Sequence, residues 1–140
     1  MVDKAKVKIY WEKSVENYRV SDTALVNHQF NASASRYYYA LYLGFWAYFE
    51  SKGITVPNKY YPTVPPRKIP DPSWDKRELK EKAVCELGTQ ITNLETLMDI
   101  ALKLRVKGDY KPFPVEEREL KNLRLKADKI LVELDTLTIR

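Results

Sequence analysis

The segment from Tyr37 to Phe49 contains no charged side chain, and it constrains the fold more than any other part of the chain. Its 13 positions fall short of the roughly 20 apolar residues that span a bilayer. We therefore predict a buried helix from about Asn31 to Lys52, which holds eight of the 17 aromatic residues (10 Tyr, 3 Trp and 4 Phe). Apolar side chains occur nearly all round this helix, so other elements must cover it on most sides.

Proline and glycine residues separate this helix from its neighbours. Six of the eight prolines lie between Val56 and Trp74. This connection is long for a compact domain, so it is either a packed functional loop or a mobile one. Gly53 and Gly108 each follow a lysine and are predicted to end the helices before them. Outside short stretches such as Ile54 to Val56, no alternating pattern predicts a strand.

Apolar spacing predicts two helices on either side of these breaks. The first runs from about Lys6 to Asn27, where an apolar residue recurs every seven positions, at Trp11, Tyr18 and Leu25. The second runs from Asp75 to about Val106, because Asp75 and Glu78 have the spacing of a capping box. Its predicted buried face follows a heptad made of Val84, Leu87, Ile91, Leu94, Met98 and Ala101.

A last helix is predicted from near Glu116 to Leu137, with acidic residues in its first turn to suit the helix dipole. Its buried face is predicted to consist of Leu120, Ala127, Ile130, Leu134 and Leu137. Together these segments predict a single all-α domain over residues 1–140, an antiparallel bundle of four to five helices. The helix at 31–52 presents more apolar surface than three neighbours cover, so we expect a homodimer through it.

Composition and charge narrow the class of protein further. The 24 Lys+Arg and 19 Asp+Glu give a net charge of +5, spread diffusely, which mildly favours phosphate-bearing or acidic partners. A lone cysteine, Cys85, and a lone histidine, His28, exclude an internal disulfide and the usual four-ligand zinc site. The N-terminus lacks the apolar stretch of a signal peptide. A cytoplasmic protein without metal, cofactor or membrane association is therefore expected.

Few side chains suit catalysis or ligand binding. His28 is the one conventional base for neutral pH, but it falls in a predicted turn, where an exposed or capping role is more common. Arg36 opens the most apolar helix, and its five donors suit phosphate recognition; from spacing alone, an arginine that reaches solvent or pairs with a carboxylate is the commoner outcome. The tyrosine-rich face either stacks bases or belongs to the core. Arg105 lies in a basic cluster that either follows a phosphate backbone or is a solvated helix end.

Two motifs resemble those of a known family. Ser35-Arg36-Tyr37-Tyr38-Tyr39-Ala40 is similar to the Ser-Arg-Ala-Tyr-Tyr-Ala hallmark of the HEPN family (higher eukaryotes and prokaryotes nucleotide-binding domain). Downstream, Leu104-Arg105-Val106-Lys107-Gly108-Asp109-Tyr110 resembles the family's Leu-Arg-x-x-Ala-Asp-Tyr, and an acidic-led helix follows as usual. The resemblance covers nearly the whole chain in the expected order.

The resemblance implies a helical bundle, commonly dimeric, and one of two activities. Many members are metal-independent ribonucleases with an Arg-x(4 to 6)-His motif, whereas others partner a minimal nucleotidyltransferase in toxin-antitoxin pairs. Arg36 matches the family arginine, but Leu41, Tyr42 and Leu43 stand where the histidine is expected. General acid-base assistance is worth roughly 10² to 10⁴ in rate, so this departure favours a non-catalytic member.

Three hypotheses follow. The first is a non-catalytic protein that binds a nucleotide, RNA or a partner nucleotidyltransferase. The second is a ribonuclease toxin with a non-standard acid-base group, for which His28 and Tyr42 are the candidates. The third is a structural dimerisation module. No catalytic or metal residue is assigned, and the candidate binding residues are Ser35, Arg36, Tyr39, Tyr42, Arg105, Asp109 and Tyr110.

Overall fold

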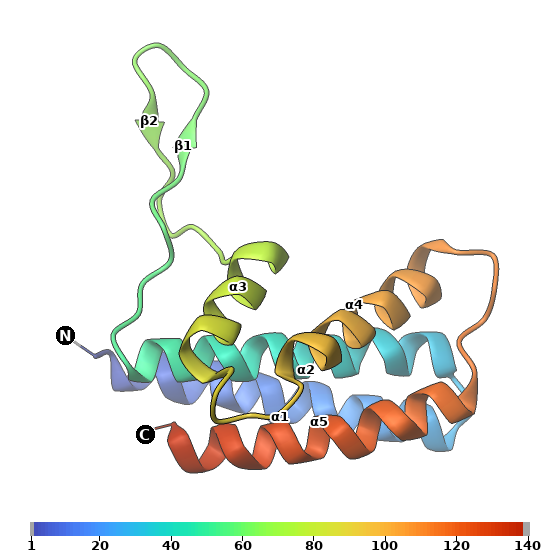
Figure 1. The fold of residues 1–140 in the computed structure, drawn as a ribbon. Coiled ribbons are helices and arrows are strands. Elements are labelled where there is room, and N and C mark those ends of the chain that lie inside the picture. The colour runs from blue at the N-terminus through green and yellow to red at the C-terminus, as the bar shows by residue number, and fades with distance from the viewer. Residues whose placement is uncertain (1, 139–140) are drawn as a thin grey trace.

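The computed structural model describes residues 2–138, which form five helices and one short two-stranded ribbon (Figure 1). The all-α bundle predicted from the sequence is confirmed. The helices are α1 (Lys4–Val26), α2 (Phe30–Ser51), α3 (Lys76–Leu87), α4 (Leu94–Tyr110) and α5 (Glu117–Leu137). The strands are β1 (Tyr60–Tyr61) and β2 (Arg67–Lys68), which pair antiparallel.

Helix α2 is the centre of the bundle, as its apolar circumference predicts. It packs against each of the other four helices (Figure 1). Of its 22 residues, 13 are buried, and Tyr37, Phe45 and Phe49 are completely so. A helix that is apolar on most sides gains hydrophobic stabilisation only when most sides are covered, and here a single chain provides most of that cover.

The face that α1 turns to α2 differs from the prediction in part. Leu25 is buried as predicted, but the other two residues of the predicted heptad are not. Trp11 and Tyr18 are only half-buried, and the buried heptad consists of Val7, Ser14 and Ser21. These small side chains let the two backbones approach and exchange hydrogen bonds. Ser14 donates to the Ala40 carbonyl at 2.6 Å, Ser21 donates to the Ser33 carbonyl at 2.7 Å, and Ser33 donates to the Ser21 carbonyl at 3.0 Å. The heptad of large residues therefore predicted Trp11 and Tyr18 as the centre of the contact, whereas they lie at its edge.

The prediction of one helix from Asp75 to Val106 is wrong. Helix α3 ends at Leu87, a connection follows over residues 88–93, and α4 begins at Leu94. Leu87, Ile91 and Leu94 are all buried, so the heptad correctly marks core positions. The connection nevertheless includes the poor helix formers Gly88, Thr89, Thr92 and Asn93, and Asn93 adopts the left-handed conformation with φ of 60°.

The two glycines predicted to end helices behave differently. Gly53 follows α2 with φ of 71°, the left-handed geometry of a helix stop, as predicted. Gly108 instead lies inside α4, which continues to Tyr110. A Cβ atom at Gly108 would lie 3.0 Å from the carbonyl oxygen of Asn31 in α2, so this glycine permits a close approach between two helices.

The predicted starts of α3 and α5 are confirmed. Asp75 and Glu78 form a capping box at α3, and Glu116 and Glu119 form one at α5. The buried residues of α5 include Leu120, Ala127, Ile130 and Leu134 as predicted, together with Leu123, whereas Leu137 is half-buried. None of the helices in residues 2–138 is long and apolar enough to cross a membrane.

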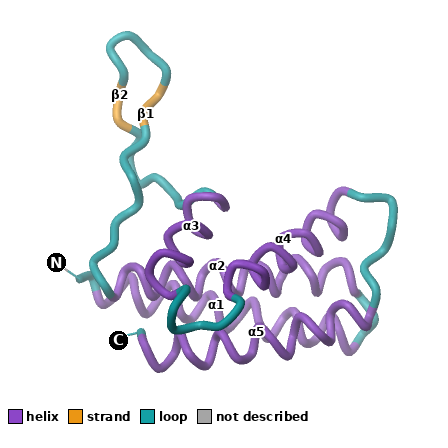
Figure 2. Tube along the Cα trace, viewed as in Figure 1, coloured by secondary structure: helices purple, strands orange, loops and turns teal. Residues whose placement is uncertain are grey.

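The connection between α2 and α3 projects from the bundle as a hairpin (Figures 1 and 2). We call residues 57–74 the arm. Its strands are only two residues long, with Tyr60 opposite Lys68 and Tyr61 opposite Arg67. The sequence pattern missed these strands because they are too short to show alternation. At the base, the Lys59 ammonium pairs with Glu78 at 2.8 Å and donates to the Ser73 carbonyl at 2.7 Å, which ties the arm to α3.

The close contact between α1 and α2 generates a stability prediction. Ser21→Leu places a large side chain in a fully buried position and removes the hydrogen bond that the Ser21 hydroxyl donates to the Ser33 carbonyl. Overpacking costs about 1–3 kcal/mol and the lost hydrogen bond about 1 kcal/mol, so we expect a loss of at least about 2 kcal/mol in urea unfolding. Arg19→Leu, at an exposed position of the same helix, is the control. Equal stability of the two variants would contradict this packing.

Candidate functional site

Arg105 is the one charged side chain that is buried in the described part of the chain, with 7% of its surface exposed. Its guanidinium lies over two tyrosine rings of α2, with its carbon 5.2 Å from the Tyr39 ring centre and 5.6 Å from that of Tyr38. Nη2 donates a hydrogen bond to the Tyr39 hydroxyl at 3.1 Å. Cation–π contacts of this kind hold a cation against aromatic rings without neutralising its charge.

The hydrogen-bonding capacity of Arg105 is only partly used. Nε and Nη1 are buried and have no hydrogen-bond partner. The nearest carboxylate, Asp109, has an oxygen 3.7 Å from Nε, which is an ion-pair distance but too long for a hydrogen bond. A buried donor on a charged group without a partner costs several times what an ordinary hydrogen bond contributes. The site therefore has N–H donors without an acceptor, and an anion is the kind of ligand that could accept hydrogen bonds from them.

The position of Arg105 follows from how α4 docks on α2. Arg105 continues the buried stripe of Met98 and Ala101, so it faces α2 rather than solvent. One turn later, Gly108 allows α4 to approach the backbone of Asn31, whose side-chain oxygen accepts a hydrogen bond from the Val115 N–H at 3.0 Å. These contacts fix the C-terminal half of α4 against the start of α2.

An open pocket of about 570 Å³ lies beside this cluster. Its aromatic wall consists of Tyr38, Tyr39, Tyr42 and Trp74, and its rim consists of Asp75, Lys76 and Arg77 at the start of α3. We call it the tyrosine pocket. Lys76 forms no ion pair within the described residues, whereas Arg77 pairs with Glu81 at 3.0 Å. Aromatic rings with cations nearby suit a flat ring that carries a negative group.

The tyrosines of this pocket are hydrogen-bond donors at neutral pH. Tyr42 donates its hydroxyl to the Trp74 carbonyl, which joins α2 to the base of the arm. Burial raises the pKa of Tyr42 to about 12. Burial also raises the pKa of Tyr38, against the opposing effect of Arg105. A phenol with so high a pKa is a poor general base, because it loses its proton far above the pH at which it would have to act.

The structure brings together some of the predicted binding residues and not others. Tyr39, Arg105 and Asp109 form one cluster, and Tyr42 lies beside Tyr39 in the wall of the pocket. Arg36 is exposed and donates to the Asn17 side chain of α1 at 3.2 Å, so its partner is an amide rather than a carboxylate. Ser35 is half-buried, and Tyr110 is 70% exposed at the end of α4. None of these last three lines the tyrosine pocket. Arg105 and Asp109 do not line it either, and Arg105 adjoins the pocket only through the Tyr38 and Tyr39 rings that its guanidinium covers.

His28 lies in the turn between α1 and α2, as predicted. It is exposed and has a positive φ of 58°. Its ring meets Phe30 edge-on at 5.5 Å between centres. No hydrogen bond joins it to Arg36 in the described residues, and it does not line the tyrosine pocket. Proton transfer between the imidazole and a substrate held by Arg105 therefore has no support in this geometry.

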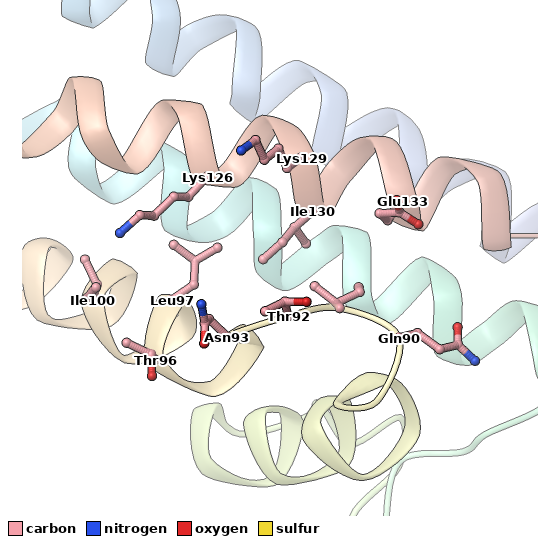
Figure 3. Close-up of a pocket in the computed structure, with 11 residues that line it drawn as sticks. Gln90, Thr92, Asn93, Thr96, Leu97, Ile100, Lys126, Lys129, Ile130 and Glu133 are labelled. Carbon is pink, nitrogen blue, oxygen red and sulfur yellow. The ribbon is translucent and has the colours of Figure 1, made fainter.

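A second cavity, of about 470 Å³, lies between the α3–α4 connection and α5 (Figure 3). Lys126 and Lys129 stand at its α5 side, and Asn93 and Thr96 at its α4 side. Both lysines are exposed, and no aromatic ring lines the cavity. It offers charge without a stacking surface, so it lacks the combination that the tyrosine pocket provides.

Sequence reasoning missed Tyr38, Trp74, Lys76 and Arg77 as site residues. Tyr38 belongs to the apolar helix that was predicted to be buried, and Trp74 ends the proline-rich connection, so neither pattern indicated a pocket. Both side chains are buried, and both line the pocket. One available signal was overlooked: the heptad through Ile91 and Met98 continues to Arg105. An arginine on a predicted buried stripe is unusual, and it would have separated Arg105 from its solvated neighbours.

A scan against protein-family models and a search of curated proteins found no match. The resemblance to the HEPN family therefore stays a prediction from the two motifs. Within the residues that the structure covers, no group of three or more His, Cys, Asp or Glu side chains is arranged to hold a metal ion.

The raised pKa of Tyr42 predicts a loss of stability in alkali. Because the folded-state pKa of about 12 exceeds the ordinary value of 10.0, the stabilisation is complete below pH 10 and is lost as the pH rises from there towards 12. In thermal unfolding between pH 9 and pH 11, we expect Tyr42→Phe to show a smaller fall in Tm than the wild type. Tyr61→Phe, which removes an exposed phenol, should keep the wild-type slope, and identical slopes for all three proteins would contradict the assignment.

Proposed function

We propose that the chain is a non-catalytic, HEPN-type protein that binds a nucleotide or nucleic acid in the tyrosine pocket. The observation that carries the proposal is the buried Arg105 guanidinium, whose Nε and Nη1 donors have no hydrogen-bond partner, next to an aromatic-walled pocket. A guanidinium donates charge-assisted hydrogen bonds to phosphate oxygens, and tyrosine rings stack on a base. Asp109, half-exposed beside Nε, steadies the arginine in the absence of ligand.

The non-catalytic assignment rests on the missing histidine of the family motif, since no imidazole lines the tyrosine pocket. His28 lies in the turn between α1 and α2, where its ring contacts Phe30, and it does not line the pocket. Tyr42 keeps its proton to about pH 12. The resemblance adds an expected setting, a cytoplasmic protein that partners a minimal nucleotidyltransferase in a toxin-antitoxin pair. The ribonuclease alternative would need acid-base chemistry from a group outside the tyrosine pocket.

The pocket predicts a specific pattern of nucleotide binding. Arg105→Lys keeps the charge but removes the planar fork, so we expect calorimetric Kd values for ribonucleoside monophosphates to rise at least about tenfold, which corresponds to about 1.4 kcal/mol. Lys76→Ser, which removes an exposed rim charge and disturbs no core packing, should give a smaller rise. Arg19→Ser on α1 is the control. If Arg36→Ala removes binding and Arg105→Lys leaves it unchanged, the ligand site has been assigned to the wrong arginine.

We also propose a homodimer through the exposed stripe of α2. Arg36 and Leu43 lie at helical spacing on one face, and neither of them is fully covered within the chain. This stripe is narrower than the sequence implied, because 13 residues of α2 are buried within one chain. A two-fold interface places the same patch of both protomers in contact, so this stripe would pack against its own copy.

The dimer is testable by analytical ultracentrifugation. A glutamate at the half-buried Leu43 would place like charges in a two-fold contact, so we expect Leu43→Glu to sediment as a monomer at concentrations where the wild type is a dimer. Val20→Glu, at an exposed apolar position of α1, is the control and should stay dimeric. A wild-type protein that is monomeric at all concentrations would exclude this interface.

A further inference from the structure

We propose that the arm is a second binding surface and that it binds a single-stranded nucleic acid. The proposal extends the proposed function, because it assigns the partner class to a part of the molecule outside the tyrosine pocket. The strands of the arm stand away from the helices (Figures 1 and 2), and every residue from Tyr60 to Lys68 is exposed. These side chains contribute nothing to the core of their own chain.

The arm presents the same chemistry on both faces. Side chains of paired residues in an antiparallel ribbon share a face, and successive residues alternate between faces. Tyr60 and Lys68 therefore share one face, and Tyr61 and Arg67 share the other. Each face carries one tyrosine ring and one cation. The Arg67 guanidinium lies 5.8 Å from the centre of the Tyr61 ring, so ring and charge are within reach of one nucleotide.

The charge of the arm favours an anionic partner. From Ser51 to Pro70 the chain carries Lys52, Lys59, Arg67 and Lys68 and no carboxylate. Lys59 is used at the base, where it pairs with Glu78, whereas Arg67 and Lys68 form no ion pair in the part of the chain that the structure describes. Cations beside exposed rings are the combination that binds phosphates and stacks bases of an unpaired strand.

The rings distinguish a nucleic acid from other anionic partners. Tyr60 is 56% exposed and Tyr61 is 43% exposed, so both rings offer apolar surface. The carboxylates of an acidic peptide would not cover this surface, whereas a stacked base would. In a duplex the base faces are already stacked, so they are not available to these rings. A second copy of the arm is disfavoured by like charge and by the three prolines in its tip, Pro62, Pro65 and Pro66, which cannot donate to a strand pair.

The arm also leaves the bundle next to the tyrosine pocket. Trp74, its last residue, lines the pocket, and Lys59 at its base pairs with Glu78 in the first turn of α3. A nucleotide in the pocket and further nucleotides along the arm would then belong to one strand. Linked contacts of this kind raise affinity for an oligonucleotide above that for a mononucleotide.

The test uses the full chain and a dye-labelled 12-nucleotide single strand, measured by fluorescence anisotropy. Two double variants remove the rings (Tyr60→Ser with Tyr61→Ser) or the charges (Arg67→Ser with Lys68→Ser). We expect each to raise Kd at least about tenfold. We also expect the charge variant to reduce the salt slope of log K by about 1.4, at roughly 0.7 for each phosphate contact on a single strand. Lys126→Ser with Lys129→Ser removes two exposed charges of α5 and is the matched control.

Mononucleotide binding separates this proposal from the proposed function. Arm variants should bind ribonucleoside monophosphates as the wild type does, whereas Arg105→Lys should weaken both ligands. The arm assignment is overturned if the wild type does not bind the strand at low salt, or if the arm variants bind it unchanged. It is also overturned if the ring variant is unaffected while polyglutamate or a duplex of equal length competes as well as the strand. If Arg105→Lys binds the strand as the wild type does while the arm variants bind it more weakly, the arm proposal stands and the tyrosine pocket is refuted as a binding site.

Discussion

The burial of one long uncharged helix organises the whole molecule. α2 contributes 13 buried residues, including Tyr37, Phe45 and Phe49. Because these apolar side chains lie on most sides of the helix, they leave water only when other helices cover most sides. The contact with α1 is close because Ser14 and Ser21 are small and can hydrogen-bond across it. The other faces are covered by α3, α4 and α5.

This arrangement has a chemical consequence at one place on α2. The docking of α4 brings Arg105 over Tyr38 and Tyr39, where its charge is held by aromatic rings and only one nitrogen makes a hydrogen bond. Core packing alone does not require a cation there, since an apolar side chain would cost less to bury. The unused donors and the adjoining pocket are what make this position a candidate site rather than a structural detail.

The sequence predicted the helices more accurately than the surfaces they share. The bounds of α2 were predicted to within one residue, and the start of α3 was fixed by Asp75 and Glu78, because local chemistry determines both. The break at residues 88–93 was missed because the heptad of core positions continues across it. A periodic pattern records which residues are buried and not whether the backbone stays helical between them. The same limit applies to α1, where large residues concealed the small ones that make the contact.

The chain by itself determined an all-helical fold, a central aromatic helix and two arginine-containing motifs, since these depend on residue type and local spacing. Only the tertiary structure decided that Arg105 is buried and that Arg36, which opens the most apolar helix, is exposed, because their burial depends on which helix docks beside them. The arm was decided in the same way. Its strands are too short for a pattern, and its base is joined to α3 by the pairing of Lys59 with Glu78, residues that only folding brings together.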